Sequence, residues 1–333
     1  MKYLFVFLLV GLTSEVNAQT ETVKQPICDE IDGLKVVSTL KKKYKELKST
    51  NYTGVAFKCI GEKVVGLWYF QDGKHEGIQK EWHENGQLYR EWIERNGMYA
   101  GLKKMWYENG QLCSLENWRC ALRDGRLTNW EDGLSRQWHA NGQLSSEKNW
   151  KDGEEDGLSR QWHANGQLSS EAYWKDGEED GVWKTWRKNG QLRSECKMKG
   201  YRAIDGLRRE WHENGQLSSE GHYVADPINY KDGCYKTGIH REWDENGELK
   251  YEGNWKDGQE HGLQRSWHEN GQLYREAILN ENVRLYKIWY DNGQLSFEVE
   301  TRNRDMISQK CFDEDGNKKE CTGGSYFYMK GTR

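Results

Sequence analysis

Histidine is the residue type in this chain best suited to bind a metal or to transfer a proton at neutral pH. Five histidines stand in the repeated motif Trp-His-x-Asn-Gly, namely His83, His139, His163, His212 and His268. If each motif is a β-hairpin, equivalent histidines lie two strands apart, or roughly 9–10 Å. Ligands of one zinc ion bind at about 2.0 Å and lie much closer together. We therefore expect half-exposed histidines beside turns, and no metal site.

The acidic residues and the known catalytic motifs give no stronger candidate for a metal site or an active site. Glu154–Asp156 and Glu178–Asp180 could attract calcium, but they lack the alternating oxygen ligands of a calcium loop and are interpreted as solvated turns. The sequence contains no nucleophile–base pair, phosphate-binding loop or metalloprotease motif. Serine, histidine and glutamate recur because the whole motif recurs. We predict that the chain is not an enzyme and uses no cofactor.

A repeated element must position these side chains, because Asn-Gly followed by Gln-Leu or Glu-Leu recurs nine times, mostly at intervals of about 24 residues. A Trp stands three residues before each of these Asn residues, and a Leu three residues after. A Lys or Arg stands five residues before, and an aliphatic residue seven before. The asparagines are Asn85, Asn109, Asn141, Asn165, Asn189, Asn214, Asn246, Asn270 and Asn292.

Asn-Gly between alternating runs is a strong hairpin signal, and a second turn, as in Lys151–Gly157, follows each hairpin. The predicted fold class is all-β: an elongated antiparallel meander of tandem hairpins of about 24 residues each. Twist should curve this single sheet. Two units are longer by about eight residues, within Asn117–Gly133 and Val224–Gly238.

The register of each hairpin has two alternatives. A two-residue Asn-Gly loop would place Arg160 opposite Glu171. A three-residue loop, with Gly166 left-handed in a bulge, would place Trp162 opposite Leu168. An exposed ion pair contributes about 0.2–1 kcal/mol, whereas burying a Leu contributes roughly 1.5–3 kcal/mol. The bulged register is therefore expected, with the ionic side chains meeting diagonally or between units.

In the bulged register, one face of this hairpin is predicted to be apolar. Its members are Leu158, Trp162, Leu168, Ala172 and Trp174. The other face is then richer in Ser, Gln, Glu and His.

The N-terminus has the pattern of a secretory signal peptide. Lys2 precedes the apolar run Tyr3–Leu12, and Val16 and Ala18 occupy the small-residue positions before Gln19. The run is too short for a transmembrane helix, so no transmembrane segment is predicted. We expect export to the periplasm, the cell surface or the medium.

The predicted domain organisation has four parts. A signal peptide covers residues 1–18, and a capping segment with a possible short helix in Leu40–Lys48 covers 19–53. The repeat array covers 54–321, and a tail covers 322–333.

Eight cysteines in an exported chain favour disulfides. Two pairs are near enough in sequence to bridge a single turn: Cys113 with Cys120, and Cys311 with Cys321. Less close alternatives are Cys28 with Cys59 and Cys196 with Cys234.

Composition narrows the class of partner. The mean hydropathy is −1.06, yet the chain has 17 Trp and 18 Tyr, which is not the composition of a disordered chain. The net charge of −4 gives no electrostatic case for nucleic acid. The repeats carry no basic face, so binding to membrane lipid is not expected.

The repeating unit resembles the MORN-repeat variant family (membrane occupation and recognition nexus). The unit GLSRQWHANGQLSSEAYWKDGEEDG at Gly157–Gly181 matches the family pattern of Gly, aromatic, Asn-Gly-Gln-Leu, Glu, aromatic, Asp-Gly and Gly. The resemblance covers about residues 54 to 321 and implies a β-hairpin array. Many bacterial members are labelled as antitoxins of toxin–antitoxin modules, which implies an antitoxin or immunity role; the export signal would move that role to the periplasm.

The sequence therefore predicts a non-enzymatic, exported scaffold that binds a protein partner through an extended aromatic-rich surface. Trp138, Trp162 and Trp186 represent the candidate anchors, and the alternative is that they form the core. Two other functions stay open: an antitoxin or immunity protein whose partner is a toxin, and an envelope protein that binds carbohydrate through its aromatic residues or is structural.

Overall fold

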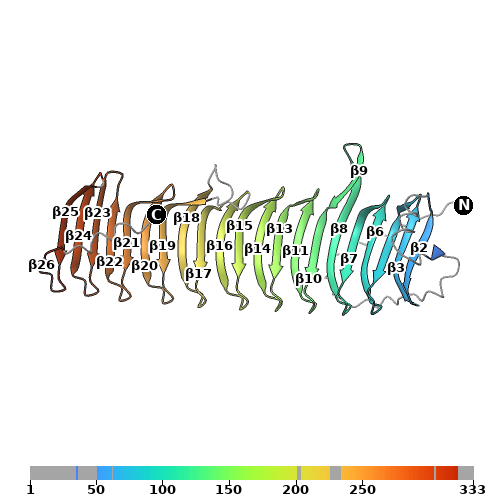
Figure 1. The fold of residues 1–333 in the computed structure, drawn as a ribbon, viewed down its shortest axis with the longest axis horizontal. Helices are drawn as coiled ribbons and strands as arrows, with labels where there is room; N and C mark the ends of the chain where they lie inside the picture. The colour runs from blue at the N-terminus through green and yellow to red at the C-terminus, as the bar shows by residue number, and fades with distance from the viewer. Residues whose placement is uncertain are drawn as a thin grey trace. The chain divides into compact units, whose positions relative to one another are not determined.

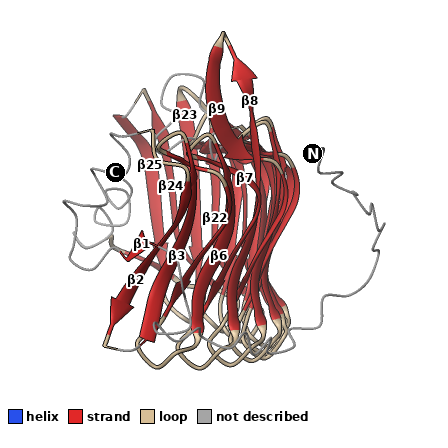
Figure 2. Cartoon of the chain, turned by 90° about the vertical axis from the view of Figure 1, so that its right-hand side faces the viewer, coloured by secondary structure: helices blue, strands red, loops and turns tan. Residues whose placement is uncertain are grey.

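The computed structural model describes residues 35–36, 51–61, 63–200, 204–225, 234–303 and 305–321. The predicted signal peptide, most of the predicted cap 19–53 and the tail 322–333 lie outside these residues. Every regular element described is a β-strand, with no helix among the described residues (Figure 2). The chain divides into two compact units, Met1–Ser145 and Ser146–Arg333.

The first unit is an antiparallel meander in which most strands pair with the next along the chain, while β5 pairs with β3 and β10 with β8 (Figure 1). One exception is β1, which pairs in parallel with β2. Its strands are β1 (Lys35–Val36), β2 (Gly54–Ile60), β3 (Lys63–Gln71), β4 (Lys74–His75), β5 (Gly77–Trp82), β6 (Leu88–Arg95), β7 (Met98–Trp106), β8 (Leu112–Arg123), β9 (Arg126–Glu131) and β10 (Gly133–Trp138).

The second unit is also an antiparallel meander, from β11, which begins just before the division, to β26. Its strands are β11 (Leu144–Lys151), β12 (Glu154–Glu155), β13 (Gly157–Trp162), β14 (Leu168–Lys175), β15 (Glu178–Trp186), β16 (Leu192–Lys199), β17 (Ile204–Trp211), β18 (Leu217–Ala225), β19 (Cys234–Trp243), β20 (Leu249–Lys256), β21 (Gln259–Trp267), β22 (Leu273–Leu279), β23 (Val283–Trp289), β24 (Leu295–Arg302), β25 (Asp305–Phe312) and β26 (Lys318–Lys319). The prediction of an all-β hairpin meander is confirmed.

The Asn-Gly turn has the predicted three-residue loop. The N–H of His163 donates to the carbonyl of Gln167 at 2.8 Å, and the N–H of Gly166 donates back to His163 O at 2.8 Å. Gly166 has φ +85°, the left-handed conformation that glycine adopts without steric cost. Trp162 is directly opposite Leu168, which confirms the predicted pairing.

The two registers proved not to be exclusive, which corrects part of the prediction. Trp162 pairs with Leu168, but Gln161 pairs with Ser170, so Ser169 is an extra residue in a β-bulge. Beyond this bulge Arg160 does face Glu171.

The bulge at Ser169 also changes which side chains share a face. Leu158 pairs with Tyr173, whereas Ala172 pairs with Ser159 and Trp174 pairs with Gly157. Because side chains alternate along a strand and directly paired residues share a face, Ala172 and Trp174 lie on the opposite face from Leu158. The prediction of one face holding all five apolar residues is therefore wrong.

The second turn of the repeat unit that contains β11 is a tight two-residue loop. Lys151 pairs with Glu154, which leaves Asp152 and Gly153 as the loop. Both have positive φ, 53° and 92°, as the type I′ turn requires.

The hairpin β13–β14 is joined to the next hairpin at its Asn-Gly edge by three side-chain contacts, which we call the turn ties. In the first, His163 Nε2 donates to the carbonyl of Trp186 in the next hairpin, at 3.0 Å. In the second, Asn165 Nδ2 donates to Lys188 O at 2.7 Å. In the third, the side chain of Gln167 lies over the turn glycine of the next hairpin, 3.1 Å from where a Cβ at Gly190 would stand.

The first turn tie depends on a donor rather than on histidine. Tyr107 Oη donates to Trp138 O at 2.8 Å in the first unit. In the second unit, Arg187 Nη2 donates to Trp211 O at 2.8 Å, and Tyr290 Oη donates to Phe312 O at 3.0 Å. The turn ties therefore satisfy carbonyls that the strand ladders leave open.

Of the two disulfides predicted across single turns, the structure contains one. Cys311 and Cys321 are joined by a disulfide, with Cα atoms 5.4 Å apart. Cys113 and Cys120 are free thiols, because both lie on the one strand β8 with no turn between them. Seven residues of extended chain span roughly 23 Å, far beyond the reach of a disulfide. Cys59 is also disulfide-bonded, and its predicted partner Cys28 lies outside the described residues.

The alternative pairing of Cys196 with Cys234 is also wrong. Both are free, and their strands β16 and β19 have β17 and β18 between them. Three interstrand steps amount to roughly 14 Å, which a disulfide cannot span.

Replacing the donor of a turn tie should weaken the array. His163→Leu leaves the Trp186 carbonyl without its partner and should lower the free energy of unfolding by about 1 kcal/mol. His163→Arg should leave it nearly unchanged, because Arg187 already makes this contact in the next hairpin. Urea denaturation followed by tryptophan fluorescence measures both; equal losses in the two variants would contradict the donor role.

Candidate binding face

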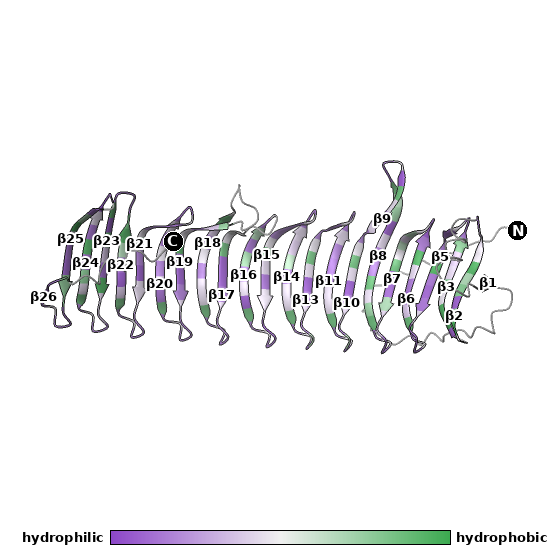
Figure 3. Ribbon diagram, viewed as in Figure 1, coloured by the Kyte–Doolittle hydropathy of each residue, from purple (hydrophilic) through white to green (hydrophobic). Residues whose placement is uncertain are grey.

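The two faces of the sheet differ in kind. One face, which we call the ion-pair face, is defined by the hairpin β13–β14. On β13 this face carries Leu158, Arg160 and Trp162, and on β14 it carries the residues paired with them. The reverse face carries Ser159, Ala172 and Trp174, among others. Figure 3 shows the resulting alternation of polar and apolar residues along the strands.

Ion pairs across each hairpin form a continuous row on the ion-pair face of the second unit. The N–O distances run from 2.7 to 3.6 Å. The pairs are Arg160–Glu171, Lys184–Glu195, Arg209–Glu220, Arg241–Glu252, Arg265–Glu276 and Lys287–Glu298. Partly exposed pairs of this kind contribute about 0.2–1 kcal/mol each, so the row sets register and leaves little unbalanced charge.

Beside this row runs a line of apolar side chains, some exposed and some half-buried, which we call the apolar stripe. Tyr173 is 48% exposed, Ile239 44%, Val182 40% and Ile278 38%. Each stripe residue stands two positions along its strand from a residue of the ion-pair row, so the stripe and the row run side by side. The full stripe in the second unit is Leu158, Tyr173, Val182, Leu207, Ile239, Leu263, Ile278 and Leu285.

The reverse face of the second unit is packed instead. Among its described residues, every buried side chain lies on this face, including Met198, His240, Gln264 and Val299. Long cationic side chains lie over aromatic rings there, as with Lys236 over Trp255 at 4.5 Å. The reverse face therefore covers itself, whereas the ion-pair face leaves apolar groups in water.

The predicted anchors Trp138, Trp162 and Trp186 belong to the row nearest the Asn-Gly edge. Trp138, in the first unit, is only 7% exposed. Trp162 and Trp186, in the second unit, are half-buried, and each faces a Leu across its hairpin.

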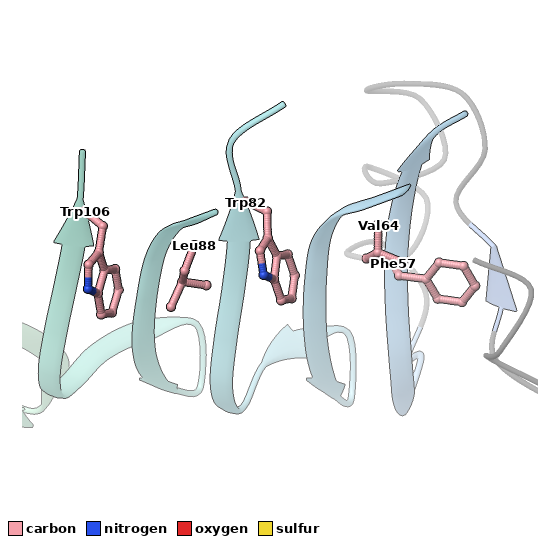
Figure 4. Packing of buried hydrophobic residues seen from close by; sticks show 5 residues of the cluster. All are labelled: Phe57, Val64, Trp82, Leu88 and Trp106. Atoms are coloured by element: carbon pink, nitrogen blue, oxygen red, sulfur yellow. The ribbon is translucent and has the colours of Figure 1, made fainter. Parts of the chain in front are cut away.

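In the first unit the same row is part of the core. Figure 4 shows Phe57, Val64, Trp82, Leu88 and Trp106 side by side along it. The tryptophans therefore hold hairpins together, and the structure brings Trp162 and Trp186 onto the same face as the more exposed apolar stripe.

The sequence did contain the signal for the stripe. An aliphatic residue stands seven positions before the Asn of each of the nine repeated turns. A core role was the natural interpretation, since no pattern in one sequence says which face of a single-layer sheet is covered.

The described residues contain no group of three or more His, Cys, Asp or Glu that could hold a metal ion. The part of the chain that the structure describes also has no helix able to cross a membrane. The histidines beside the turns hold backbone carbonyls, as His212 Nε2 does with Trp243 O at 2.8 Å.

One thiol on the reverse face is strongly perturbed. Burial raises the pKa of Cys196 to about 11, against the opposing effect of the Arg208 guanidinium on the paired strand. Its Sγ lies 3.5 Å from Met198 Sδ. Cys196 is thus a packed thiol held in its neutral form.

The fold and this face define a tandem β-hairpin repeat protein. The MORN repeat variant family matches nine segments, which together cover more than half of the chain. The segments are 75–93, 100–119, 131–152, 155–176, 179–199, 204–225, 236–257, 260–279 and 285–303. The chain belongs to the MORN repeat variant family.

No curated protein matches the chain. Among solved structures, a Tc holotoxin pore from Photorhabdus luminescens is 10% identical with a TM-score of 0.20, over 79% of this chain and 14% of that one. A TcdB2-TccC3-Cdc42 structure is 12% identical with a TM-score of 0.13, over 77% of this chain and 18% of that one. A porin-like protein from Bacteroides uniformis is 8% identical with a TM-score of 0.17, over 73% and 91%. At these TM-scores the likenesses support no inference about fold or function.

The raised pKa of Cys196 gives a prediction for alkaline pH. The unfolded thiol loses its proton near pH 9 and the folded one near pH 11, so stability should fall as the pH rises between these values. Cys196→Ser should remove this part of the pH dependence, as measured by urea denaturation at pH 8, 9, 10 and 11. Cys120→Ser is the matched control, and an identical pH profile for wild type and Cys196→Ser would contradict the assignment.

Proposed function

We propose that this protein is a non-enzymatic repeat scaffold that binds a protein partner through the ion-pair face of its second unit. The observation that carries the proposal is the apolar stripe, in which Tyr173, Val182 and Ile239 are each at least 40% exposed. Rows of apolar side chains left in water on a soluble surface mark interaction sites.

The chemistry around the stripe favours a protein over other partners. The cations beside the stripe are already paired with carboxylates, as in Arg241–Glu252 at 2.7 Å, so they offer little to a phosphate backbone. An apolar line with a polar row beside it is instead the arrangement of a protein interface. Burying Val182 or Ile239 against a partner would contribute roughly 1.5–3 kcal/mol each.

The half-buried Trp162 and Trp186 extend the same face toward the Asn-Gly edge. They support the proposed surface as secondary anchors, with the stripe supplying most of the exposed apolar area.

A charge placed in the stripe should abolish partner binding without unfolding the array. Val182→Glu and Ile239→Glu should each lose the partner that wild type retains in affinity purification from the producing cell's envelope, as identified by mass spectrometry. Gln161→Glu adds the same charge to an exposed position on the reverse face and should retain the partner. Recovery of the same partner with all three variants, or of no specific protein with wild type, would refute the proposal.

We also propose that the protein is exported and that residues 1–18 are removed. The pattern before Gln19 supports this, and the Cys311–Cys321 disulfide suits an oxidising compartment. Intact-mass measurement of the protein recovered from its producing cells should give a chain that begins at Gln19. A chain that retains Met1 to Ala18 in the cell interior would contradict export.

A further inference from the structure

The junction between β20 and β21 lacks the turn ties that join other hairpins of the second unit. Asp244 stands where the hairpins before it and the two after it carry a His, Tyr or Arg donor, and an ionised carboxylate has no proton to donate. Its Oδ1 instead accepts the N–H groups of Asn246 and Glu248 in its own turn, each at 2.9 Å. Its Oδ2 lies 3.0 Å from Lys250 Nζ, and this contact, together with the two N–H donors, lowers the pKa of Asp244. The first tie is therefore absent.

The other two ties are missing at the same place. Among the described residues, the Asn246 amide makes no hydrogen bond to the next hairpin, whereas Asn214 donates to Glu245 O and Asn270 donates to Asp291 O. Within the described part of the chain the Asn189 amide also bonds only within its own turn, but its junction keeps the tie from Arg187. Glu248 replaces the glutamine, and no atom lies within 4 Å of a Cβ placed on Gly271. At Gly190, Gly215, Gly247, Gly293 and Gly316 a glutamine side chain lies within 3.5 Å of that position.

One weak contact remains at this edge. Lys250 Nζ lies 3.4 Å from the carbonyl of His268. The strand ladder between β20 and β21 begins at Tyr251 and Ser266, at the same level as in the other junctions, so without the ties little else joins the two hairpins near their Asn-Gly turns.

The middle of the junction is firmly held. Gln264 is 1% exposed, and its Nε2 donates to Asn254 O at 2.6 Å and to His261 O at 3.1 Å. Tyr251 Oη donates to Gln264 Oε1 at 2.7 Å. Gly253 leaves the space that Gln264 fills, since a Cβ there would lie 1.9 Å from its Oε1. The junction is thus loose at the Asn-Gly edge and fixed from Gln264 onward toward the Asp-Gly turn.

The last hairpin that the structure describes has the same inward-turned aspartate. Asp313 Oδ1 accepts the N–H of Asn317 at 2.8 Å and that of Asp315 at 3.1 Å. An aspartate at this position closes its own turn and offers nothing to a following hairpin. Asp244 makes the same contacts within its own turn, but it stands inside the array, where another hairpin follows.

We propose that the β20–β21 junction is a hinge. The hairpins on its two sides separate at the Asn-Gly edge and pivot about Gln264. The apolar stripe crosses the junction between Ile239 and Leu263, so the hinge changes the curvature of the candidate binding face. The hinge rests on the missing ties alone and does not depend on the proposed partner.

The chain contains a matched control for this hinge. Residues 209–217 read REWHENGQL and residues 241–249 read REWDENGEL, so the two turns differ only at the positions of His212 and Gln216. Asp244→His with Glu248→Gln should restore the ties, and His212→Asp with Gln216→Glu should remove them from the preceding junction.

Hydrogen–deuterium exchange of the full chain, followed by mass spectrometry, tests the hinge. In wild type, amides of 249–252 and 265–268 should exchange about tenfold faster than those of 217–220 and 241–243, because hydrogen bonds worth about 1 kcal/mol each are missing. The Asp244→His/Glu248→Gln variant should slow the fast segments about tenfold. The His212→Asp/Gln216→Glu variant should create fast exchange at 217–220.

Equal exchange at the two junctions of wild type would overturn the hinge, as would fast exchange that persists at 249–252 after the ties are restored. If the converse variant fails to fold, the comparison of wild type with the restored variant still decides the question.

Discussion

Each hairpin of this protein must satisfy its neighbour's backbone, and the rest of the structure depends on that requirement. A single-layer sheet has no second layer to cover it, so cohesion comes from contacts between adjacent hairpins. Strand ladders provide these contacts along most of the length but stop short of the Asn-Gly turns, as at Ser170 and Thr185. Beyond that point the carbonyls of Trp186 and Lys188 are held by side chains, and the recurring Asn and Gln follow from this need.

Much of the fold could be predicted from the sequence, because turn chemistry is local. Asn-Gly with a Leu three residues later was enough to predict a left-handed Gly166 and a Trp162–Leu168 pair. The bulge at Ser169 could not be predicted, since no residue type marks it, and it moved Ala172 and Trp174 to the other face.

The candidate site was less accessible from sequence than the fold. Tryptophan suggested binding anchors, yet Trp138 is buried and the exposed groups are aliphatic residues such as Val182. Exposure depends on which face packs upon itself, and that depends on long side chains such as Gln264 lying over neighbouring glycines. The turn ties could not be predicted from the sequence either. His163, Arg187 and Tyr290 each donate a hydrogen bond, but they are three different residue types.

The turn ties have a direction. A hairpin that makes the ties donates from its own turn and accepts at its own tryptophan carbonyl, so it meets the hairpin before it and the hairpin after it with complementary chemistry. Such a unit behaves like a monomer in a polymer with a head and a tail. A whole unit can be gained or lost by recombination and the flanking hairpins still fit, whereas loss of half a unit would join two heads or two tails. The twin copies Gly133–Glu147 and Gly157–Glu171, identical in every residue, are what such growth by whole units leaves in a gene.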